Sequence, residues 1–429
     1  MDLKDKQRYY AQCRDEPLEP NDERNLDIDQ CPAAPRGRGW VGRLAEPISL
    51  SPRVPVQLFF SALPGSGKST ELRRLKALLS SPPNNLLVAL VDAVNELDLT
   101  GTIDAFDILA VLVHRTEELI LEREGKNAAA ALHDGYLKRL WNWLQTTDAE
   151  LTQAQFSIPE AASLTVEMKM RPALRERLRQ NVANHLPRFL QEIREEFRLL
   201  EGRAKKCGHA GLVVILDSLE KLRGPTTTYD QVLASAEKLF AGGAPYLALP
   251  VHSVLTIPPA VYARLATLQV DFMPVVKVRN QDGKLCQEGI DVMRELVRLR
   301  IPDHALQEIL GQEQCEPRIT EVIVQSGGYP RDVVNVLRRL IETPAYPVSD
   351  KAFASWLNEQ KERYRIVVTQ DDYPWLRHVA KSKELDIKSD AHRATADRAL
   401  QNHIVLRYCN EKTWWDLHPA VAQIPGIAP

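Results

Sequence analysis

The chain has 429 residues, which favours two or three domains rather than one. Its 44% apolar residues, 26% charged residues and net charge of −2 are ordinary for a soluble globular protein and show no overall basic character of the kind that binds nucleic acid non-specifically. The six cysteines form no CxxC pair and predict free thiols, and no secretion signal or membrane-spanning run is visible, so we expect a cytoplasmic protein.

Strand and helix signals alternate along much of the chain. Residues 1–36 are polar and predict an irregular N-terminal arm. Apolar runs predict buried strands at 54–61, 86–91, 211–216 and 251–257, and a fifth strand at 275–278. Helical periodicity predicts helices at 70–79, 103–122 and 230–241. This alternation predicts an α/β fold with a parallel sheet and right-handed crossovers.

Other segments carry helical signals alone. Residues 125–206 are long, charged and helical in period, and we interpret them as a helical insertion in the α/β region. Within it, residues 172–200 predict one or two helices with a break at Pro187. The pattern is again helical after residue 287, and residues 350–429 predict a separate small unit.

A glycine-rich turn separates the first predicted strand from the first predicted helix. Residues 62–69, Ala-Leu-Pro-Gly-Ser-Gly-Lys-Ser, fit the Walker A pattern with Ala in place of its first Gly. Gly65 and Gly67 permit backbone angles that a Cβ forbids, so the loop can turn its N–H groups toward phosphate oxygens. The predicted nucleotide-binding residues of this loop are Pro64, Gly65, Ser66, Gly67, Lys68, Ser69 and Thr70. Lys68 would reach the β- and γ-phosphates of ATP, and Ser69 would bind Mg²⁺.

A second motif follows the third predicted strand. Residues 212–217, LVVILD, are an apolar strand that ends in a carboxylate, which is typical of Walker B. At the carboxyl edge of a parallel sheet, Asp217 would lie beside the phosphate loop and hold Mg²⁺. Glu220 would orient or deprotonate the attacking water; the alternative is that Asp217 caps the next helix and Glu220 pairs with Lys221. Ser218 stands where AAA+ enzymes commonly have Glu, so hydrolysis is less certain than nucleotide binding.

Three further segments resemble STAND and origin-recognition-type AAA+ ATPases. Val41, Gly42 and Arg43 match a hydrophobic-Gly-Arg motif that packs near the adenine in those proteins, although Leu44 replaces the usual Glu. Thr256 stands at the position of sensor 1, a polar side chain that detects the γ-phosphate.

The third segment, GGYPRD at 327–332, is similar to the sensor 2 motif of the helical lid. There an arginine, here Arg331, opens a helix that points at the nucleotide, because Gly and Pro set a sharp helix entry and a guanidinium binds phosphate in a fork-like way. The alternative is that Arg331 marks an ordinary surface helix end.

The end of the chain predicts a helix at 394–401 followed by strands at 404–408 and 413–417, an order typical of winged-helix domains. The whole set is similar to stand-alone bacterial P-loop ATPases encoded in anti-phage and other conflict operons. The resemblance covers roughly residues 40–122 and 207–429, and the helical insertion lies outside it. Together with the residue patterns it predicts four parts: an N-terminal arm at 1–36, a P-loop ATPase core at 37–286 containing the insertion at 125–206, a helical lid at 287–349 and a winged-helix-like domain at 350–429.

The resemblance implies an Mg²⁺-dependent, ATP-hydrolysing regulatory switch that controls a separate effector protein. It also implies a homo-oligomer in which a neighbour's arginine completes the site; the sequence does not choose among Arg279, Arg298 and Arg300. No membrane partner is expected.

Two alternatives stay open. The first is an initiator-like ATPase that binds nucleic acid through basic groups of the winged helix, which are Arg393, Arg398, His403 and Arg407. It is less favoured because the same segment carries the acidic residues Asp390, Asp397, Glu411 and Asp416. The second is a scaffold that binds nucleotide to fold and does not hydrolyse it.

Overall fold

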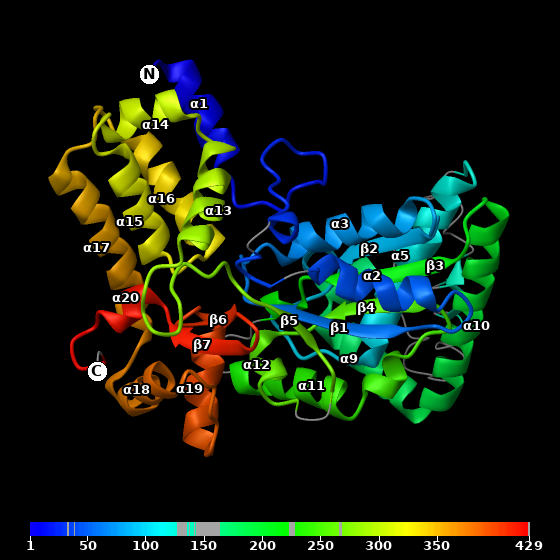
Figure 1. The fold of residues 1–429 in the computed structure, drawn as a ribbon. Helices are drawn as coiled ribbons and strands as arrows, with labels where there is room; N and C mark the ends of the chain where they lie inside the picture. The colour runs from blue at the N-terminus through cyan, green and yellow to red at the C-terminus, as the bar shows by residue number, and fades with distance from the viewer. Residues whose placement is uncertain are drawn as a thin grey trace. The chain divides into compact units, whose positions relative to one another are not determined.

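The computed structural model describes residues 1–31, 34–37, 39–126, 135–136, 138–140, 142, 164–222, 228–265 and 268–427 (Figure 1). The chain divides into two compact units. One, which we call the loop unit because it contains the glycine-rich loop, comprises Met1–Trp40, Ser61–Arg73 and Phe272–Pro429. The other, which we call the sheet unit, comprises Val41–Phe60 and Arg74–Asp271.

A five-stranded sheet has the strand order β2-β3-β4-β1-β5. Its strands are β1 (Gln57–Ala62), β2 (Leu87–Asp92), β3 (Leu212–Asp217), β4 (His252–Thr256) and β5 (Asp271–Met273). The pairs β2–β3, β3–β4 and β4–β1 are parallel, and β3 is buried along its whole length, as a central parallel strand should be. The predicted α/β fold with a parallel sheet is confirmed, together with its first four strands.

The fifth strand was predicted at the wrong place. Instead of lying at 275–278, it is the short β5, which Pro274 follows directly. Proline has no amide hydrogen to donate to a sheet ladder, so the strand stops there. The next residues bond elsewhere in the loop unit: Val275 N donates to Arg407 O (3.0 Å), and Lys277 N donates to Pro35 O (2.8 Å).

Helices connect the strands at nearly the predicted places. In the first part of the chain they are α1 (Leu3–Gln12), α2 (Trp40–Leu50), α3 (Lys68–Ser80), α4 (Ala93–Glu96), α5 (Ala105–Arg123), α8 (Leu164–Met170), α9 (Pro172–Asn184), α10 (Leu186–Lys206), α11 (Tyr229–Ala241) and α12 (Pro259–Tyr262), with the 3-10 turns η1 (Ile28–Gln30), η4 (Leu219–Lys221) and η5 (Ala244–Leu247). The predicted helices at 70–79, 103–122 and 230–241 are confirmed as α3, α5 and α11. Because α5 contacts β2, β3 and α10, every residue from Ala105 to Val113 is buried.

The helical character of the insertion is confirmed for residues 164–206, which form α8, α9 and α10. The break between the last two helices falls at His185, and Pro187 lies in the first turn of α10, where its missing amide hydrogen costs nothing. Residues 127–134, 137, 141 and 143–163 of the predicted insertion lie outside the described residues.

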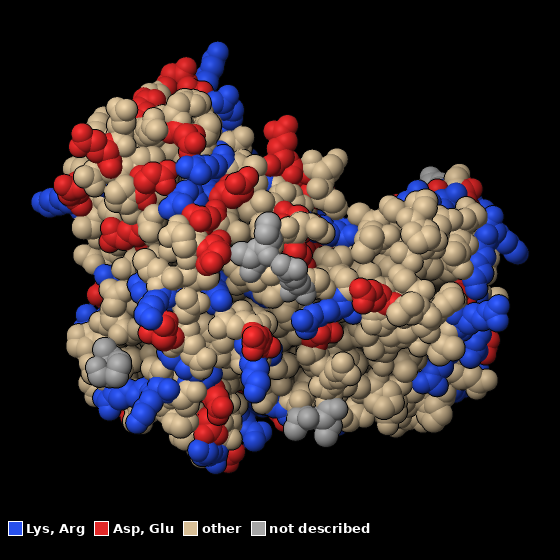
Figure 2. Space-filling view, in the orientation of Figure 1, with Lys and Arg blue, Asp and Glu red and all other residues tan. Residues whose placement is uncertain are grey.

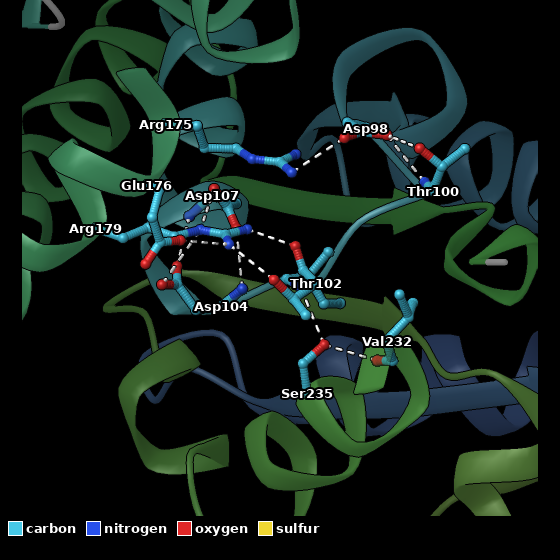
Figure 3. A network of polar contacts seen from close by, with 11 residues as sticks. Asp98, Thr100, Thr102, Asp104, Asp107, Arg175, Glu176, Arg179, Val232 and Ser235 are labelled. Carbon is cyan, nitrogen blue, oxygen red and sulfur yellow. Dashed lines mark hydrogen bonds and ion pairs between the residues drawn. The ribbon is translucent and has the colours of Figure 1, made fainter. Parts of the chain in front are cut away.

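A buried polar network joins α9 to the segment that leads into α5 (Figure 3). Arg179 of α9 donates from Nε to Asp107 Oδ1 (3.2 Å) and from Nη1 to Thr102 Oγ1 (3.0 Å). Its Nη2 forms an ion pair with Asp107 Oδ2. The neighbouring Ile103 N donates to Ser235 of α11 (3.1 Å). Within the sheet unit, α9 is therefore tied to α5 by charge as well as by apolar packing.

The core of the loop unit is helical. Its remaining helices are α13 (Gln287–Arg298), α14 (Asp303–Leu310), α15 (Cys315–Gln325), α16 (Pro330–Glu342), α17 (Asp350–Val367), α18 (Tyr373–Ser382), α19 (Asp390–Gln401) and α20 (Pro419–Ala422), with the turn η6 (Gln370–Asp372). They confirm the helical pattern predicted after residue 287. Among the described residues, no helix combines the length and apolar character needed to cross a membrane.

We predicted an irregular N-terminal arm at 1–36. This prediction is wrong for Leu3–Gln12, which form the helix α1. Asp2 caps α1 by accepting from Asp5 N (2.8 Å). Tyr9 and Cys13 are then buried in the core of this unit, where α1 contacts α16. The composition misled because the stretch is polar on the whole, while its scattered apolar residues reach the core through partners far along the chain.

The end of the chain confirms the predicted helix and hairpin. α19 leads to the antiparallel pair β6 (Val405–Cys409) and β7 (Thr413–Leu417). Three ring contacts pack this segment: Tyr408 stacks on Trp414 (centroids 4.6 Å apart), Tyr364 stacks on His418 (4.0 Å), and Phe272 meets Trp415 edge to face (5.5 Å).

Candidate functional site

The glycine-rich loop has the local structure that its sequence predicts. It leaves the buried end of β1 and enters α3 at Lys68. Gly65 and Gly67 have φ values of +91° and +98°, which side chains rarely adopt. The strand, turn and helix that a phosphate loop requires are therefore all present.

The loop also has the donors that an anion needs. Among the described residues, the amides of Gly65 and Gly67 donate to no backbone carbonyl, and the buried Ser66 Oγ has no hydrogen-bond partner. A Cβ placed on Gly67 would meet no atom within 4 Å, so open space lies beside this residue. Lys68, the positively charged residue of the loop, is buried at the start of α3. These features fit a bound phosphate group.

The two hydroxyl residues at the start of α3 differ in their surroundings. Ser69 and Thr70 are both half-buried. Thr70 Oγ1 accepts a hydrogen bond from Leu18 N (3.1 Å), so it contacts the N-terminal arm. Ser69, at the position predicted to bind Mg²⁺, directly follows Lys68 in the first turn of the helix.

The predicted sensor arginine contacts the glycine-rich loop. Arg331 lies in the first turn of α16, whose first residue is Pro330. Its Nη1 donates to Pro64 O (3.4 Å), and the phenol of Tyr329 donates to the same carbonyl. A Cβ on Gly65 would lie 2.5 Å from both Arg331 Nε and Tyr329 Oη. Residues far apart in the sequence thus meet at the loop, and Gly65 is needed for their close approach.

The electrostatics of this contact are set by burial and by neighbouring charge. Burial raises the pKa of Tyr329 well above its usual range, so its hydroxyl keeps the proton that it donates to the loop. Burial alone would lower the pKa of Arg331, but interactions with Tyr329 and with the Asp15 carboxylate outweigh it and raise the pKa. Arg331 is therefore a permanent cation beside the loop.

The two glycines before Tyr329 allow the turn to pack closely. Gly327 and Gly328 have φ values of +63° and +78°. A Cβ on Gly328 would lie 1.8 Å from Val276 O, and one on Gly327 would lie 2.6 Å from Leu406 of β6. The turn that presents Arg331 therefore packs against the C-terminal hairpin as well as the loop.

The predicted Walker B residues lie in the sheet unit. Asp217 is buried at the end of β3, and its Oδ1 accepts from Ser218 N (2.6 Å), with Ser218 at φ +71°. Thr256 ends β4, and its Oγ1 accepts from Leu219 N (3.1 Å). Glu220 is buried in η4. Thr256 thus holds the turn that carries Asp217 and Glu220, while β1, whose end precedes the phosphate loop, pairs with β4.

Three residues of interest were missed by the sequence analysis. Asp92 ends β2 directly opposite Asp217, which places a second carboxylate at this edge of the sheet; its position at a strand end was the available signal. Tyr329 lay inside a motif that drew attention only to its arginine. Asp15 lies 2.7 Å from Arg331 Nε, and no local pattern could have revealed it.

The segment Val41-Gly42-Arg43 forms the first turn of α2, in the sheet unit. Its predicted place near the adenine stays a prediction. Of the three candidate arginine fingers, Arg300 is buried and donates to Leu296 O (2.9 Å), so it cannot reach a neighbouring molecule. Arg279 is exposed, as is Arg298, which forms an ion pair with Asp303.

Of three comparisons with known proteins, the one with solved structures gives matches. No protein-family model matches it, and no curated protein matches it. Similar solved structures include a Walker-type ATPase of Pyrococcus abyssi, with 14% identity, a TM-score of 0.37, and 93% of this chain and 98% of that chain covered. Another is the ORC2 protein of Aeropyrum pernix in ADPNP–ADP complexes, with 11% identity, a TM-score of 0.35, and coverage of 97% and 95%. A third is Cdc6p of Pyrobaculum aerophilum, with 10% identity, a TM-score of 0.31, and coverage of 96% and 98%. At these values we rest the function on the residues of the chain itself.

Proposed function

We propose that this protein is an ATP-binding and ATP-hydrolysing regulatory switch. The observation that carries the proposal is the contact of Arg331, at the start of α16, with the loop at Pro64 and Gly65. A phosphate loop alone is compatible with many nucleotide-binding proteins. A guanidinium held against it from another helix supplies a second group that can respond to the phosphates.

The proposed roles follow from the chemistry of each group. Main-chain amides at Gly65 to Ser69 and the Lys68 ammonium would hold the β- and γ-phosphates. Ser69 and Asp217 would hold Mg²⁺, which neutralises charge that develops on the phosphates. Glu220 would orient the attacking water, and Thr256 and Arg331 would sense the γ-phosphate. Val41, Gly42 and Arg43 would lie near the adenine.

Switching requires an element that contacts the ligand differently in two states. The turn at 327–332 is suited to this role, because Tyr329 contacts Pro64 on one side and stacks on His403 of the C-terminal segment on the other (centroids 4.8 Å apart). Loss of the γ-phosphate would then be transmitted to that segment. We propose that its output is a separate effector protein, as in the conflict-operon ATPases that the sequence resembles, and that a second copy of the chain supplies Arg279 or Arg298.

Nucleic-acid binding is the weaker alternative, because most of the basic groups proposed for it have partners within the protein. Arg398 is ion-paired with Asp372, His403 stacks on Tyr329, and Arg407 lies over the rings of Phe272 and Trp415. Arg393 is exposed. Over α18 and α19, basic and acidic side chains lie side by side on the visible face (Figure 2).

Calorimetry with Mg·ATP, together with a phosphate-release assay, tests the proposal. The wild type should bind ATP and release phosphate, and Lys68→Ala should lose both, because no other side chain of the loop carries positive charge. Arg331→Ala should keep binding with slower turnover. Tight binding without phosphate release would favour the non-hydrolysing scaffold, and unchanged turnover in Lys68→Ala would refute the ATPase.

A further inference from the structure

A short acidic segment of the N-terminal arm lies along the candidate phosphate site. The segment Asp15–Glu19, which we call the strap, follows α1 and has no regular secondary structure. Asp15 Oδ2 lies 2.7 Å from Arg331 Nε. Leu18 N donates to Thr70 Oγ1 (3.1 Å) at the start of α3. Arg73, one turn further along α3, donates to Pro17 O (2.8 Å) and pairs with Glu19 (2.9 Å).

The strap is held at both ends by strong contacts. On its N-terminal side, α1 packs on α16, and Arg338 of that helix donates to Tyr10 Oη (2.6 Å). On its C-terminal side, the fully buried Arg36 pairs with Glu71 of α3 (2.8 Å) and with Asp29 (2.8 Å). Within the strap, the charged side chains are exposed, Asp15 to 43% and Glu19 to 61%, whereas Leu18 is buried. Departure of the strap from α3 therefore breaks exposed ion pairs and uncovers Leu18, while the two ends keep their own contacts.

The chemistry of the strap imitates that of a ligand. Its Asp15 carboxylate occupies the guanidinium that we assign to the γ-phosphate, as a phosphate oxygen would. The Leu18 amide is a donor to Thr70 Oγ1, a predicted nucleotide-binding residue, and so anchors the strap there without imitating a phosphate. A phosphate group carries more charge than a carboxylate and accepts more hydrogen bonds, so it competes well for an arginine fork. Once displaced from Arg331, the Asp15 carboxylate faces a triphosphate that is also negatively charged. The repulsion between the two favours the departure of the strap.

We propose that the strap is a built-in competitor of the nucleotide: Asp15 holds Arg331 until a triphosphate replaces it, and the strap then leaves α3. This inference rests on the proposed function and adds a regulatory step to it. The binding of ATP becomes coupled to the release of residues 15–19, which gives the switch a moving segment on the surface of the loop unit.

The test compares Asp15→Asn with Glu16→Gln in calorimetry with Mg·ATP. Both variants remove one negative charge from the strap, but Glu16 pairs with Arg24 rather than Arg331 (3.1 Å). We expect Asp15→Asn to bind ATP about 1.5-fold to fivefold more tightly, as the loss of a partly exposed ion pair implies. Glu16→Gln should bind as the wild type does. In an Arg331→Ala background, Asp15→Asn should bring no gain.

Hydrogen exchange at the Leu18 amide gives a second measurement that needs no variant. Its exchange should be slow without nucleotide, because it is bonded to Thr70, and should accelerate when Mg·ATP binds. Wild-type protein that binds ATP while Asp15→Asn leaves the affinity unchanged would overturn the strap and leave the proposed function intact. Unaltered exchange at Leu18 would overturn its release. An absence of ATP binding in every variant would overturn both proposals.

Discussion

Buried charged side chains in the sheet unit are held by partners from other helices. Asp107 of α5 has a side chain only 1% exposed, and Arg179 of α9 reaches it with two of its nitrogen atoms (Figure 3). A buried ion pair of this kind adds little stability over apolar packing, but the removal of one partner leaves the other charge buried and uncompensated. The pair therefore fixes the position of α9 against α5 rather than adding much to the stability of the fold.

At this scale we predict that Arg179→Met destabilises the protein by about 3–5 kcal/mol, because Asp107 is left without its cation. Arg188→Met on α10 is the matched control: that side chain is 62% exposed and pairs with Glu192, so its loss should cost less than about 1 kcal/mol. Denaturant unfolding measures both. The double variant Arg179→Met, Asp107→Asn should recover part of the loss, and equal losses for the two single variants would contradict the assignment.

The pairing of β1 with β4 depends on a histidine that must stay neutral. His252 of β4 is buried, and its Nδ1 accepts from Val56 N (3.1 Å), just before β1 begins. Burial lowers the pKa of His252 below its usual 6.5. A lowered histidine pKa contributes stability that is present above pH 6.5 and is lost as the pH falls through the folded-state pKa. Protonation also removes the acceptor that Val56 uses.

At the scale of elements we therefore predict that acid lowers the free energy of unfolding less steeply in His252→Asn than in the wild type. An asparagine oxygen can accept from Val56 N but does not titrate. Burial and the charge of Asp107 raise the pKa of Asp104 to about 6. Protonation of Asp104 therefore raises the free energy of unfolding as the pH falls through this range, which is opposite to the effect of His252. Asp104 is common to both proteins, so the difference between their slopes isolates His252. Denaturant titrations between pH 5 and 8 measure the slopes, and parallel slopes would contradict the prediction.

The elements that the sequence predicted well are those whose signal is local. β1 to β4 follow from short apolar runs, and α3 follows from apolar spacing directly after a glycine turn, so neighbouring residues alone determine them. The helix α1 was missed because Tyr9 and Cys13 are buried only by packing against distant helices. β5 was misplaced because Pro274 ends a strand that the apolar run beyond it seemed to continue.

In the candidate site, too, the features with a local sequence signal were predicted, and those that depend on contacts between distant segments were not. The glycine-rich loop is a contiguous motif, and the strand, turn and helix predicted for it are present in the structure. The roles of Asp217, Thr256 and Arg331 rest on order along the chain and stay predictions. The contacts of Arg331 with Pro64 and Asp15 join segments that no sequence pattern relates, and they became visible only once the chain was folded.

At the scale of the whole molecule, the chain passes between its two units after Trp40, Phe60, Arg73 and Asp271. The phosphate loop therefore belongs to the unit of Arg331 and the C-terminal hairpin rather than to the unit of most of the sheet. The net charge of the chain is close to zero, and the exposed basic residues of the C-terminal segment are accompanied by acids such as Asp386, which pairs with Lys388 (2.5 Å).

We therefore predict that the full chain shows no tight, salt-dependent affinity for duplex DNA. A protein that neutralises several phosphates loses affinity steeply as salt increases, because counterions are released on binding. Fluorescence anisotropy with a labelled duplex, measured from 50 to 200 mM salt, should give weak binding at all concentrations. Strong binding at low salt that falls steeply as salt rises would restore the initiator-like alternative, and Arg393→Ala would then be the first variant to examine.

The stacked pair of Tyr329 and His403 has a practical consequence. Position 403 is half-buried and lies beside the aromatic ring that touches Pro64, with the two ring centroids 4.8 Å apart. An environment-sensitive dye attached near this position would be quenched by the tyrosine to an extent that follows small displacements of the ring. The molecule thus offers an optical read-out of its own loop.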